Sequence, residues 1–443
     1  MRGKWTVMAV LTAGTIALLA LPASGIASGF ALLEQSAKGL GEAMSGGATE
    51  TEEPNSIFYN PAGIAFLESH AASAGMSAIP INAKYTDDGS TTAFGTPLLG
   101  ENDTSDVTGW VPNLFAAFKL ADTVTAGFGV TAPFGLATKY SRDFIGRYHA
   151  VETDLTTIDI SPAVSWQVIP GLLAIGGSVN FQYVDAKLTN AIDFGTILAG
   201  AGTTPQTLDG FADMTGDDWG VGYTLGILCR PTETTKIGLS YRSEVEHNLS
   251  GDVDFDVPAT ARGILNAIGR NNWFVDCDVK ADLTTPASLS LGVAQMLGEC
   301  FEVKADFSWT GWNCFRKLEV DFDSDQDDST TTENWSDTYR ISLGLDWYAT
   351  DALTLRTGTA YDQTPIPTDY RTPRIPDNNR IWLSVGASYD LTCDLTVDVA
   401  YLHLFIKDMD SNLVSLENAA KGYLVGEYEP SIDVISAEIA YRF

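Results

Sequence analysis

The sequence predicts an all-β protein: an antiparallel transmembrane β-barrel of about fourteen strands, with an N-terminal hatch plugging the lumen. Many segments alternate apolar and polar residues with a period of two, as half-buried strands do. After residue 27 the chain has no run of about 18 apolar residues that could cross a bilayer as a helix. A closed sheet is the one other structure that satisfies its own backbone hydrogen bonds in lipid, so we expect a barrel.

Residues 1–27 have the pattern of a secretory signal peptide. Two basic residues precede an apolar run from Val7 to Leu21, and small residues follow as far as Ala27. The apolar core is short for a membrane-spanning helix, so we expect cleavage and a mature chain that begins at Ser28. The exported chain has five cysteines, an odd number, which we interpret as incidental or as one or two disulfides of unknown pairing.

Residues 28–70 do not alternate, and we expect them to form the hatch inside the lumen. Several apolar residues of this segment are spaced nearly as on one face of a helix: Leu32, Leu33, Ala37, Leu40 and Met44. The stretch is nevertheless too rich in glycine to be a strong helix. Asn60-Pro61-Ala62 has the pattern of a helix start, with Asn as the N-cap and Pro at the first helical position. A barrel of this size encloses enough space for a plug.

Residues 71–443 contain the alternating segments and form the predicted barrel. In the last segment, one face has Ile435, Ala437, Ile439, Tyr441 and Phe443, and the other has Ser436, Glu438, Ala440 and Arg442. One apolar and one polar face indicate strands that contact lipid on one side and a polar lumen on the other. A chain that ends on Phe443 also resembles the terminal signal of outer-membrane barrels.

The connections between these segments are of two kinds. Short turns are expected near 121–122, 170–171, 231–234, 298–299, 350–351 and 392–394. Long polar loops are expected near 86–108, 134–150, 191–215, 249–278, 311–334, 364–379 and 408–429. Six turns and seven loops give about fourteen strands, with both ends of the barrel on the short-turn side, as in bacterial outer-membrane barrels.

The charge of the chain excludes one class of partner. Acidic residues outnumber basic residues by 57 to 26, and the formal net charge is −31. Such a chain repels a polyanion, so nucleic acid is not a partner. Acidic residues from Asp321 to Asp328 could attract calcium, but Gln326 occupies the place of the glycine that a calcium loop requires. We expect a solvated loop, bridged to lipopolysaccharide by divalent cations, and no resident metal or cofactor.

An enzyme is a distant alternative. Catalysis would need a nucleophile, or an activated water with a base. The four histidines, His70, His149, His247 and His403, lie in no sequence motif for nucleophilic catalysis. We therefore predict no catalytic residue, and we keep an outer-membrane hydrolase and a structural barrel only as distant alternatives.

Several motifs, in order along the chain, resemble those of the FadL/TodX family of outer-membrane long-chain fatty acid and hydrocarbon transporters. They are Gly29-Phe30-Ala31-Leu32, Gly39-Leu40-Gly41, Asn60-Pro61-Ala62, Trp110-Val111-Pro112-Asn113, Phe134-Gly135-Leu136-Ala137-Thr138, Tyr241-Arg242-Ser243-Glu244-Val245, Asp337-Thr338-Tyr339-Arg340, Arg356-Thr357-Gly358, Ile375-Pro376-Asp377 and Arg380-Ile381-Trp382-Leu383-Ser384. Together they extend the resemblance over nearly the whole chain after residue 27.

The resemblance implies passive import across the bacterial outer membrane, with lateral exit through the barrel wall. It places Phe30 in the hatch near the ligand and residues 60–62 at the hatch turn. It places the kink of the third strand at Gly135, beside Pro133 and Phe134. The plainer alternatives are hatch packing for Phe30 and an ordinary strand-end glycine for Gly135.

The resemblance also bears on the substrate. Fatty acid importers of the family use cations in the barrel to meet the ligand carboxylate, and this chain has Asn190 and Glu319 at those places. Arg316 and Lys317 lie close by and are the candidate carboxylate contacts. The predicted substrate is a hydrophobic small molecule: a long-chain fatty acid or, as the alternative, a neutral aromatic or aliphatic hydrocarbon. Outer-membrane lipid and lipopolysaccharide are the expected surroundings of a monomer.

Overall fold

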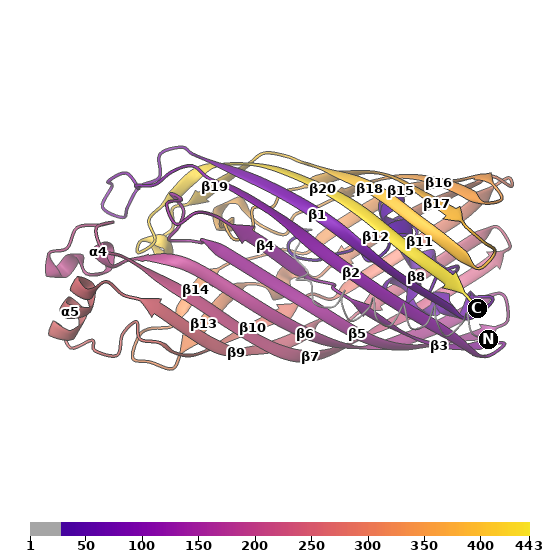
Figure 1. Cartoon of the computed structure of the whole chain (residues 1–443), viewed down its shortest axis with the longest axis horizontal. Coiled ribbons are helices and arrows are strands. Elements are labelled where there is room, and N and C mark those ends of the chain that lie inside the picture. The colour runs from indigo at the N-terminus through magenta and orange to yellow at the C-terminus, as the bar shows by residue number, and fades with distance from the viewer. Residues whose placement is uncertain (1–27) are drawn as a thin grey trace.

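The computed structural model describes residues 28–443, so the predicted signal peptide lies outside the described residues. Twenty strands form one antiparallel sheet that closes into a barrel (Figure 1). The strands are β1 (Ala71–Asp87), β2 (Thr104–Ala121), β3 (Val124–Thr131), β4 (Gly135–Lys139), β5 (Glu152–Ile169), β6 (Leu173–Asp193), β7 (Asp209–Thr232), β8 (Thr235–Arg242), β9 (Val245–Asp256), β10 (Cys277–Thr285), β11 (Ser288–Leu297), β12 (Phe301–Thr310), β13 (Lys317–Phe322), β14 (Ser329–Thr332), β15 (Thr338–Thr350), β16 (Leu353–Asp362), β17 (Arg380–Asp390), β18 (Leu395–Ile406), β19 (Met409–Leu413) and β20 (Leu424–Arg442).

Six of the strands that form the barrel wall are interrupted, and each of these six consists of two consecutive labelled strands. The pairs are β3 with β4, β8 with β9, β10 with β11, β12 with β13, β14 with β15, and β18 with β19. Counting each pair once reduces the twenty strands to fourteen wall strands. The ladder between β1 and β20, from Ala71↔Arg442 to Asp87↔Gly426, closes the barrel. The predicted fourteen-stranded barrel is confirmed.

The helices are short and lie before or between the strands. They are α2 (Ala37–Gly41), η1 (Gly47–Thr49), α3 (Ser56–Tyr59), η2 (Pro61–Phe66), α4 (Phe194–Ile197), η3 (Ala199–Ala201), α5 (Ala259–Ala267), η4 (Trp312–Cys314), η5 (Thr368–Tyr370) and η6 (Leu416–Asn418). Within residues 28–443, none of them has the length and apolarity needed to span a bilayer. All five cysteines are free, so the chain uses no disulfide among these residues.

The long loops lie at one end of the barrel and the short turns at the other, as predicted (Figure 1). The wall strands nevertheless continue far into stretches predicted as loops. β7 extends from Asp209 and β9 reaches Asp256, although 191–215 and 249–278 were expected to be loop. The outward residues of these extensions include Asp213, Thr215 and Asp254, so the outward face has no apolar alternation there.

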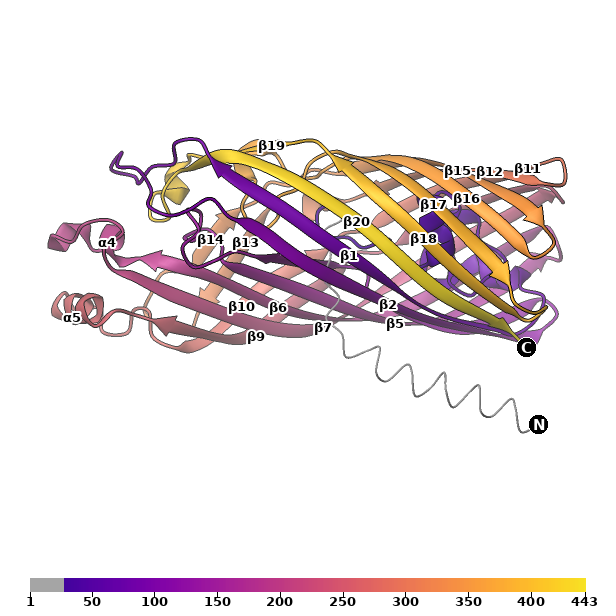
Figure 2. The ribbon, with the colours of Figure 1, turned by 45° about the horizontal axis from the view of Figure 1, so that its top comes forward.

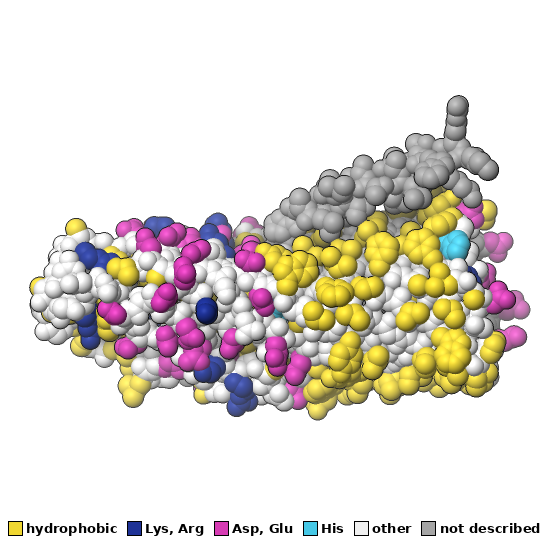
Figure 3. Space-filling view, turned by 90° about the horizontal axis from the view of Figure 1, so that it is seen from below, with side chains coloured by type: hydrophobic (Ala, Val, Ile, Leu, Met, Phe, Trp, Pro, Cys, Tyr) yellow, Lys and Arg dark blue, Asp and Glu magenta, His cyan; other side chains and the backbone are white. Residues whose placement is uncertain are grey.

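The outer surface explains this difference. On the face in Figure 3, apolar side chains gather over the half of the barrel near the short turns, and charged side chains cover the half near the loops. Large apolar residues with outward exposure include Val221, Leu225, Ile341 and Leu383. Lipid contacts only the apolar half, so only there does a strand need an apolar outward face.

Residues 28–70, which we call the N-terminal segment, lie inside the barrel (Figure 2). α2 contacts β17, β18 and β20, η1 contacts β8 and β11, and η2 contacts β5, β6 and β7. The segment thus touches walls all around the lumen. A Cβ on Gly41 would come within 2.9 Å of the Cα of Gly386, so this pair of glycines lets α2 lie against β17.

Buried ion pairs hold this segment to the wall. The Nζ atom of Lys304 on β12 lies 2.7 Å from Glu42 of the segment and 2.9 Å from Asp346 on β15. Lys38 of the segment lies 3.0 Å from Glu50. The Lys304, Glu42 and Asp346 side chains are at most 5% exposed. Their charges are shielded from solvent and depend on one another.

Removal of Lys304 therefore has a large expected cost. Lys304→Met leaves Glu42 buried without its ion-pair partner and leaves Asp346 with Arg356 alone, which costs about 3–5 kcal/mol. Lys84→Met is the matched control, because Lys84 and its partner Glu429 are 53% and 51% exposed and such pairs contribute about 0–1 kcal/mol. Free energies of unfolding from urea titrations in lipid vesicles measure both. Equal small losses would contradict the role of the buried cluster.

Candidate functional site

The third wall strand is interrupted where the sequence has Ala132, Pro133 and Phe134. β3 ends at Thr131 and β4 begins at Gly135. The ladder from β2 to β3 stops at Leu114↔Val130, and β4 pairs with β5 but with no residue of β2 in the ladder. Proline has no N–H to donate, which favours a break at this place. The wall therefore lacks its regular β2 ladder beside β4; we call this place the gap.

The N-terminal segment supplies the hydrogen bonds that the gap leaves open. The Leu32 N–H donates to the Pro133 carbonyl at 2.7 Å, and the Gly135 N–H donates to the Phe30 carbonyl at 2.9 Å. The Gln35 amide bonds the N–H and the carbonyl of Ala132 at 3.2 and 2.6 Å. Backbone groups inside a membrane protein must find such partners. The segment thus completes the broken strand from inside.

The ring of Phe30 is enclosed by four other aromatic rings, which we call the aromatic cage. Ring centroids lie 5.9 Å away for Phe134, 4.7 Å for Trp312, 5.8 Å for Phe315 and 5.7 Å for Trp335. The arrangements are edge-on or tilted, which aromatic pairs prefer. Phe30 is 2% exposed, and Trp312 and Trp335 are fully buried. Contacts across the lumen therefore fix the segment at the gap.

The cage is built by interruptions in two other wall strands. Residues 311–316 interrupt the ninth wall strand and carry Trp312 and Phe315, and residues 333–337 interrupt the tenth and carry Trp335. The Gly311 N–H bonds the Ala287 carbonyl at 2.9 Å, beside the break between β10 and β11. The sequence predicted a loop near 311–334, which includes Trp312 and Phe315, and it did not predict the cage. Large aromatic residues within a polar stretch were the available signal.

A second contact holds the start of the segment. The Gly29 N–H donates to the Asp377 carboxylate at 3.1 Å, and Thr364 donates to the same carboxylate at 2.7 Å. Arg380 lies 2.9 Å from the other carboxylate oxygen. Asp377 is fully buried in the loop between β16 and β17. An outer loop thus reaches the same segment that fills the gap.

Asn60-Pro61-Ala62 lies at the opposite end of the segment. The Ala62 N–H donates to the Asn60 side chain, so Asn60 caps η2 as predicted. Its amide also donates to the carbonyls of Ala48 at 2.7 Å and Ile227 at 3.1 Å. A Cβ at Gly226 would lie 2.0 Å from the Asn60 oxygen, so this turn requires a glycine in β7. The turn anchors the segment to the wall.

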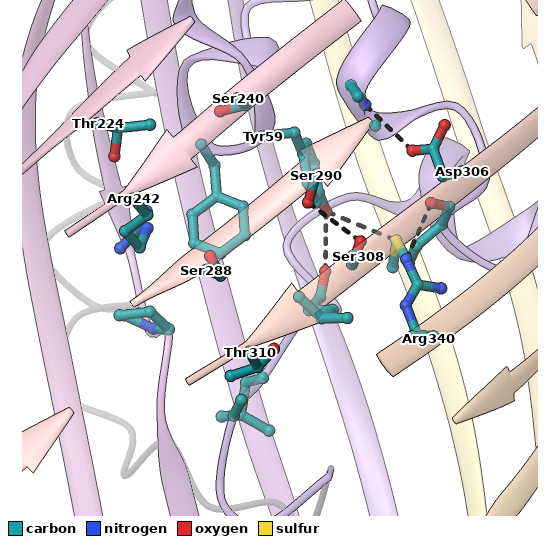
Figure 4. A pocket seen from close by; sticks show the side chains of 18 of the residues that line it. Tyr59, Thr224, Ser240, Arg242, Ser288, Ser290, Asp306, Ser308, Thr310 and Arg340 are labelled. Carbon is teal, nitrogen blue, oxygen red and sulfur yellow. Dashed lines mark hydrogen bonds between the residues drawn. The ribbon is translucent and has the colours of Figure 1, made fainter. Parts of the chain in front are cut away.

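A cavity lies between the segment, the gap and the wall strands opposite (Figure 4). One side is mostly apolar: Ala31, Leu32, Leu33, Met44, Phe58, Pro133 and Phe134. The other side is formed by β7, β8, β11, β12 and β15 and carries hydroxyl groups with Arg242 and Arg340. The cavity therefore joins the gap to an amphipathic space inside the barrel.

The candidate carboxylate contacts lie outside this cavity. Arg316 and Lys317 are exposed, and Lys317 pairs with Glu319. Neither lines the cavity, and their role stays a prediction. Arg374, which sequence reasoning missed, donates to Thr153 at 3.1 Å and to Asn190 at 3.4 Å. Arg374, a cation from a loop, thus contacts Asn190, the position where the family resemblance implies a cation on a strand.

Arg374 belongs to an outer group of charges with Lys421 and Glu333. Burial, with the Arg374 charge next in weight, lowers the pKa of Lys421 to about 8. Burial also lowers the pKa of Arg374 to about 10 and raises the pKa of Glu333 to about 8. Glu333 accepts a 3.0 Å hydrogen bond from the Trp335 indole, which connects this group to the cage. Among residues 28–443, neither cation forms an ion pair with a carboxylate.

A model of the family described as "Outer membrane protein transport protein (OMPP1/FadL/TodX)" matches residues 18–443. The chain belongs to this family. The long-chain fatty acid transport protein of Escherichia coli (strain K12) is 29% identical over 440 residues, which cover 93% of this chain and 96% of that protein. The putative outer membrane protein NMB0088 of Neisseria meningitidis is 29% identical over 423 residues, covering 89% and 91%.

Solved structures share the fold of this family member. A Pseudomonas aeruginosa FadL homologue has a TM-score of 0.87 at 23% identity, covering 94% of this chain and 99% of that chain. The Pseudomonas putida toluene transporter TodX has a TM-score of 0.70 at 18% identity, covering 94% and 99%. Membership of the OMPP1/FadL/TodX family confirms the outer-membrane location and the transport function that the motifs implied.

The aromatic cage generates a prediction for this family member. Phe30→Ala removes the ring that links the gap to the ninth and tenth wall strands, so the segment should leave the gap more often. We expect amide exchange at Leu32 and Gly135 to accelerate by at least about tenfold, since local opening then costs less. Hydrogen exchange with mass spectrometry measures it. Phe307→Ala, at a 39% exposed position on the outer surface, is the control; the same acceleration in both would contradict the prediction.

Proposed function

We propose that this protein imports long-chain fatty acids or related hydrophobic molecules passively, by lateral diffusion through the gap beside the third wall strand. One observation carries the proposal: the N-terminal segment completes the broken strand at Pro133 and Gly135 while a cavity opens directly behind it. The name of the Escherichia coli relative supports fatty acids as the substrate class. The transported molecule leaves into lipid without crossing the polar short-turn end.

Physical chemistry favours this route for an apolar solute. In a water-filled pore, the apolar surface of the solute would stay exposed to water. The cage, the cavity and the gap instead offer the solute apolar contacts one after another. In this proposal the N-terminal segment is a hatch, with Phe30 next to the ligand and Asn60-Pro61-Ala62 as its fixed turn. Displacement of Phe30 by the substrate then frees the gap at Pro133-Phe134-Gly135.

Neutral aromatic or aliphatic hydrocarbons are the second candidate. They are supported by the exposure of Arg316 and Lys317 and by the ion pair of Lys317 with Glu319, which leaves these cations away from the cavity. Fatty acids are supported by Arg374 and Lys421, because the charges of both act on Glu333, which bonds Trp335 of the cage. The two candidates differ in whether the protein has to bind a ligand carboxylate with a cation.

The protein acts in this proposal without catalysis. The nearest partners of the histidines are structural: His149 bonds the Gly422 carbonyl at 3.0 Å, and His403 bonds Asp433 at 2.7 Å. His247 bonds Gln182, and the ring of His70 accepts the N–H of Lys119. No hydroxyl or thiol nucleophile lies among these partners. We further propose a monomer whose acidic outer loops face lipopolysaccharide.

Lateral exit is tested by closing the gap. Gly135→Val with Pro133→Thr gives the third strand an N–H donor and a residue that favours strands. We expect uptake of radiolabelled oleate to fall to the level of a strain without importers. Gly216→Val, in β7 away from the gap, is the control for a Gly-to-Val change in the wall. Normal uptake by a double variant that folds and reaches the outer membrane would refute lateral exit.

The carboxylate is tested by charge and pH. Arg374→Met should weaken oleate binding by about ten- to a hundredfold, the effect of a hydrogen bond to a charged group, and leave a neutral alkylbenzene unaffected. Arg316→Ala and Lys317→Ala test the sequence-based candidates in the same titration. Loss of oleate affinity in these two variants but not in Arg374→Met would assign the carboxylate to Arg316 and Lys317.

The same site predicts a pH dependence. Between pH 7 and pH 9 Lys421 loses its proton and Glu333 becomes ionised, because both pKa values lie near 8. Burial lowers the pKa of His149 to about 3, so His149 stays neutral throughout this range. The first change removes a positive charge and the second adds a negative charge, so oleate affinity should fall as the pH rises through 8. A pH-independent affinity for oleate would contradict the assignment.

A further inference from the structure

The wall of the cavity opposite the gap is lined with hydroxyl groups (Figure 4). They belong to Thr224, Ser240, Ser288, Ser290, Ser308 and Thr310, on four neighbouring strands. The Ser290 and Ser308 hydroxyls bond each other at 3.0 Å, and Thr224 accepts from Asn180 at 2.9 Å. Within residues 28–443, the hydroxyls of Ser240, Ser288 and Thr310 have no hydrogen-bond partner, and all three line the cavity.

Two buried charged side chains of the same wall also keep an atom unpaired. The Nε of Arg340 and one oxygen of Asp306 have no hydrogen-bond partner in the described chain. Arg340 is 7% exposed and Asp306 is 4% exposed. A buried polar atom without a partner is costly, and a water or a ligand group in the cavity would relieve that cost. The wall thus offers both donors and acceptors to an occupant.

The two arginines of this wall already have partners. Arg242 lies 2.7 Å from the buried Asp159 carboxylate. Arg340 donates to the carbonyls of Ala43 at 2.9 Å and Met44 at 3.2 Å. An entering carboxylate would therefore have to compete with these partners. An uncharged hydroxyl can donate and accept at once and adds no charge.

The apolar side of the cavity limits the rest of the occupant. Ala31, Leu32, Leu33 and Phe58 offer no side-chain donor or acceptor, and Pro133 lines the route to the gap. A strongly polar solute would leave these surfaces unmatched. The occupant that fits both sides is an alkyl chain with an isolated polar group.

We propose that the cavity is a specificity site for alkyl chains that carry an uncharged hydroxyl group away from the carboxylate, that is, hydroxy fatty acids. The proposal rests on the proposed function and names a substrate class within it. The ligand hydroxyl bonds the free hydroxyls of Ser240, Ser288 and Thr310, while the chain lies against the N-terminal segment. The carboxylate end remains nearer the outer loops.

The test compares octadecanoic acid with 10-hydroxy- and 12-hydroxyoctadecanoic acid. Binding to the purified full-length protein in one detergent is followed by quenching of tryptophan fluorescence. We expect at least one hydroxy acid to bind about three- to tenfold more tightly than octadecanoic acid, the factor of one net hydrogen bond. The triple variant Ser240→Ala, Ser288→Ala, Thr310→Val should reduce this preference, measured as the ratio of the two affinities, to less than about twofold.

A matched triple variant controls for the loss of barrel hydroxyls in general. Ser161→Ala, Ser342→Ala and Thr125→Val remove three buried, unpartnered hydroxyls that do not line the cavity, and the preference should persist. Equal affinities for all three acids in the unmodified protein would overturn the inference while leaving the proposed function intact. Failure of all three acids to bind would refute the proposed function itself. A preference that survives in the cavity variant would also overturn the inference.

Discussion

Backbone hydrogen bonding in lipid is the constraint on which the rest of this structure depends. A barrel wall can be opened only where the freed N–H and carbonyl groups find other partners, because lipid offers none. Here Phe30, Leu32 and Gln35 provide those partners at the break between β3 and β4. The gap therefore depends on the segment that fills it for its hydrogen bonds.

The N-terminal segment is held by different forces at its two ends. Toward the short turns, its charges form buried ion pairs such as Glu42 with Lys304, which are costly to break singly. At the gap, it is held by hydrogen bonds of its backbone and of Gln35 and by contacts between aromatic rings. Apolar contacts can be replaced by a hydrophobic ligand of similar shape, whereas ion pairs cannot. This difference lets one end move while the other stays fixed.

Much of the fold could be predicted from the sequence, because alternation in the lipid-facing half of each strand is a local signal. The strand around Ile341 and Leu343 shows it plainly. The outer halves of the strands escaped prediction, since outward residues such as Asp213 and Asp254 contact no lipid. The break in the third strand could be predicted from Pro133 and Gly135, because proline lacks an N–H donor and glycine weakens strand pairing.

The remainder of the site could not be predicted because it joins residues far apart in the chain. Trp312 and Trp335 meet Phe30 only after the ninth and tenth wall strands bend inward. Arg374 reaches Asn190 from a loop more than a hundred residues later, so no spacing in the sequence connects them. The hydroxyl wall also requires register: Ser288 stands opposite Arg242 and Thr310 in adjacent ladders.

The polar extension of the wall strands sets the height at which a molecule enters. The 24 residues of β7, at about 3.3 Å per residue, give a strand of about 80 Å. A tilt of about 40° leaves about 60 Å along the barrel axis, against an apolar band of about 25 Å. The mouth therefore stands some 30 Å or more above the hydrocarbon. On the proposed route, a molecule captured at the mouth descends inside the barrel and meets lipid only at the gap.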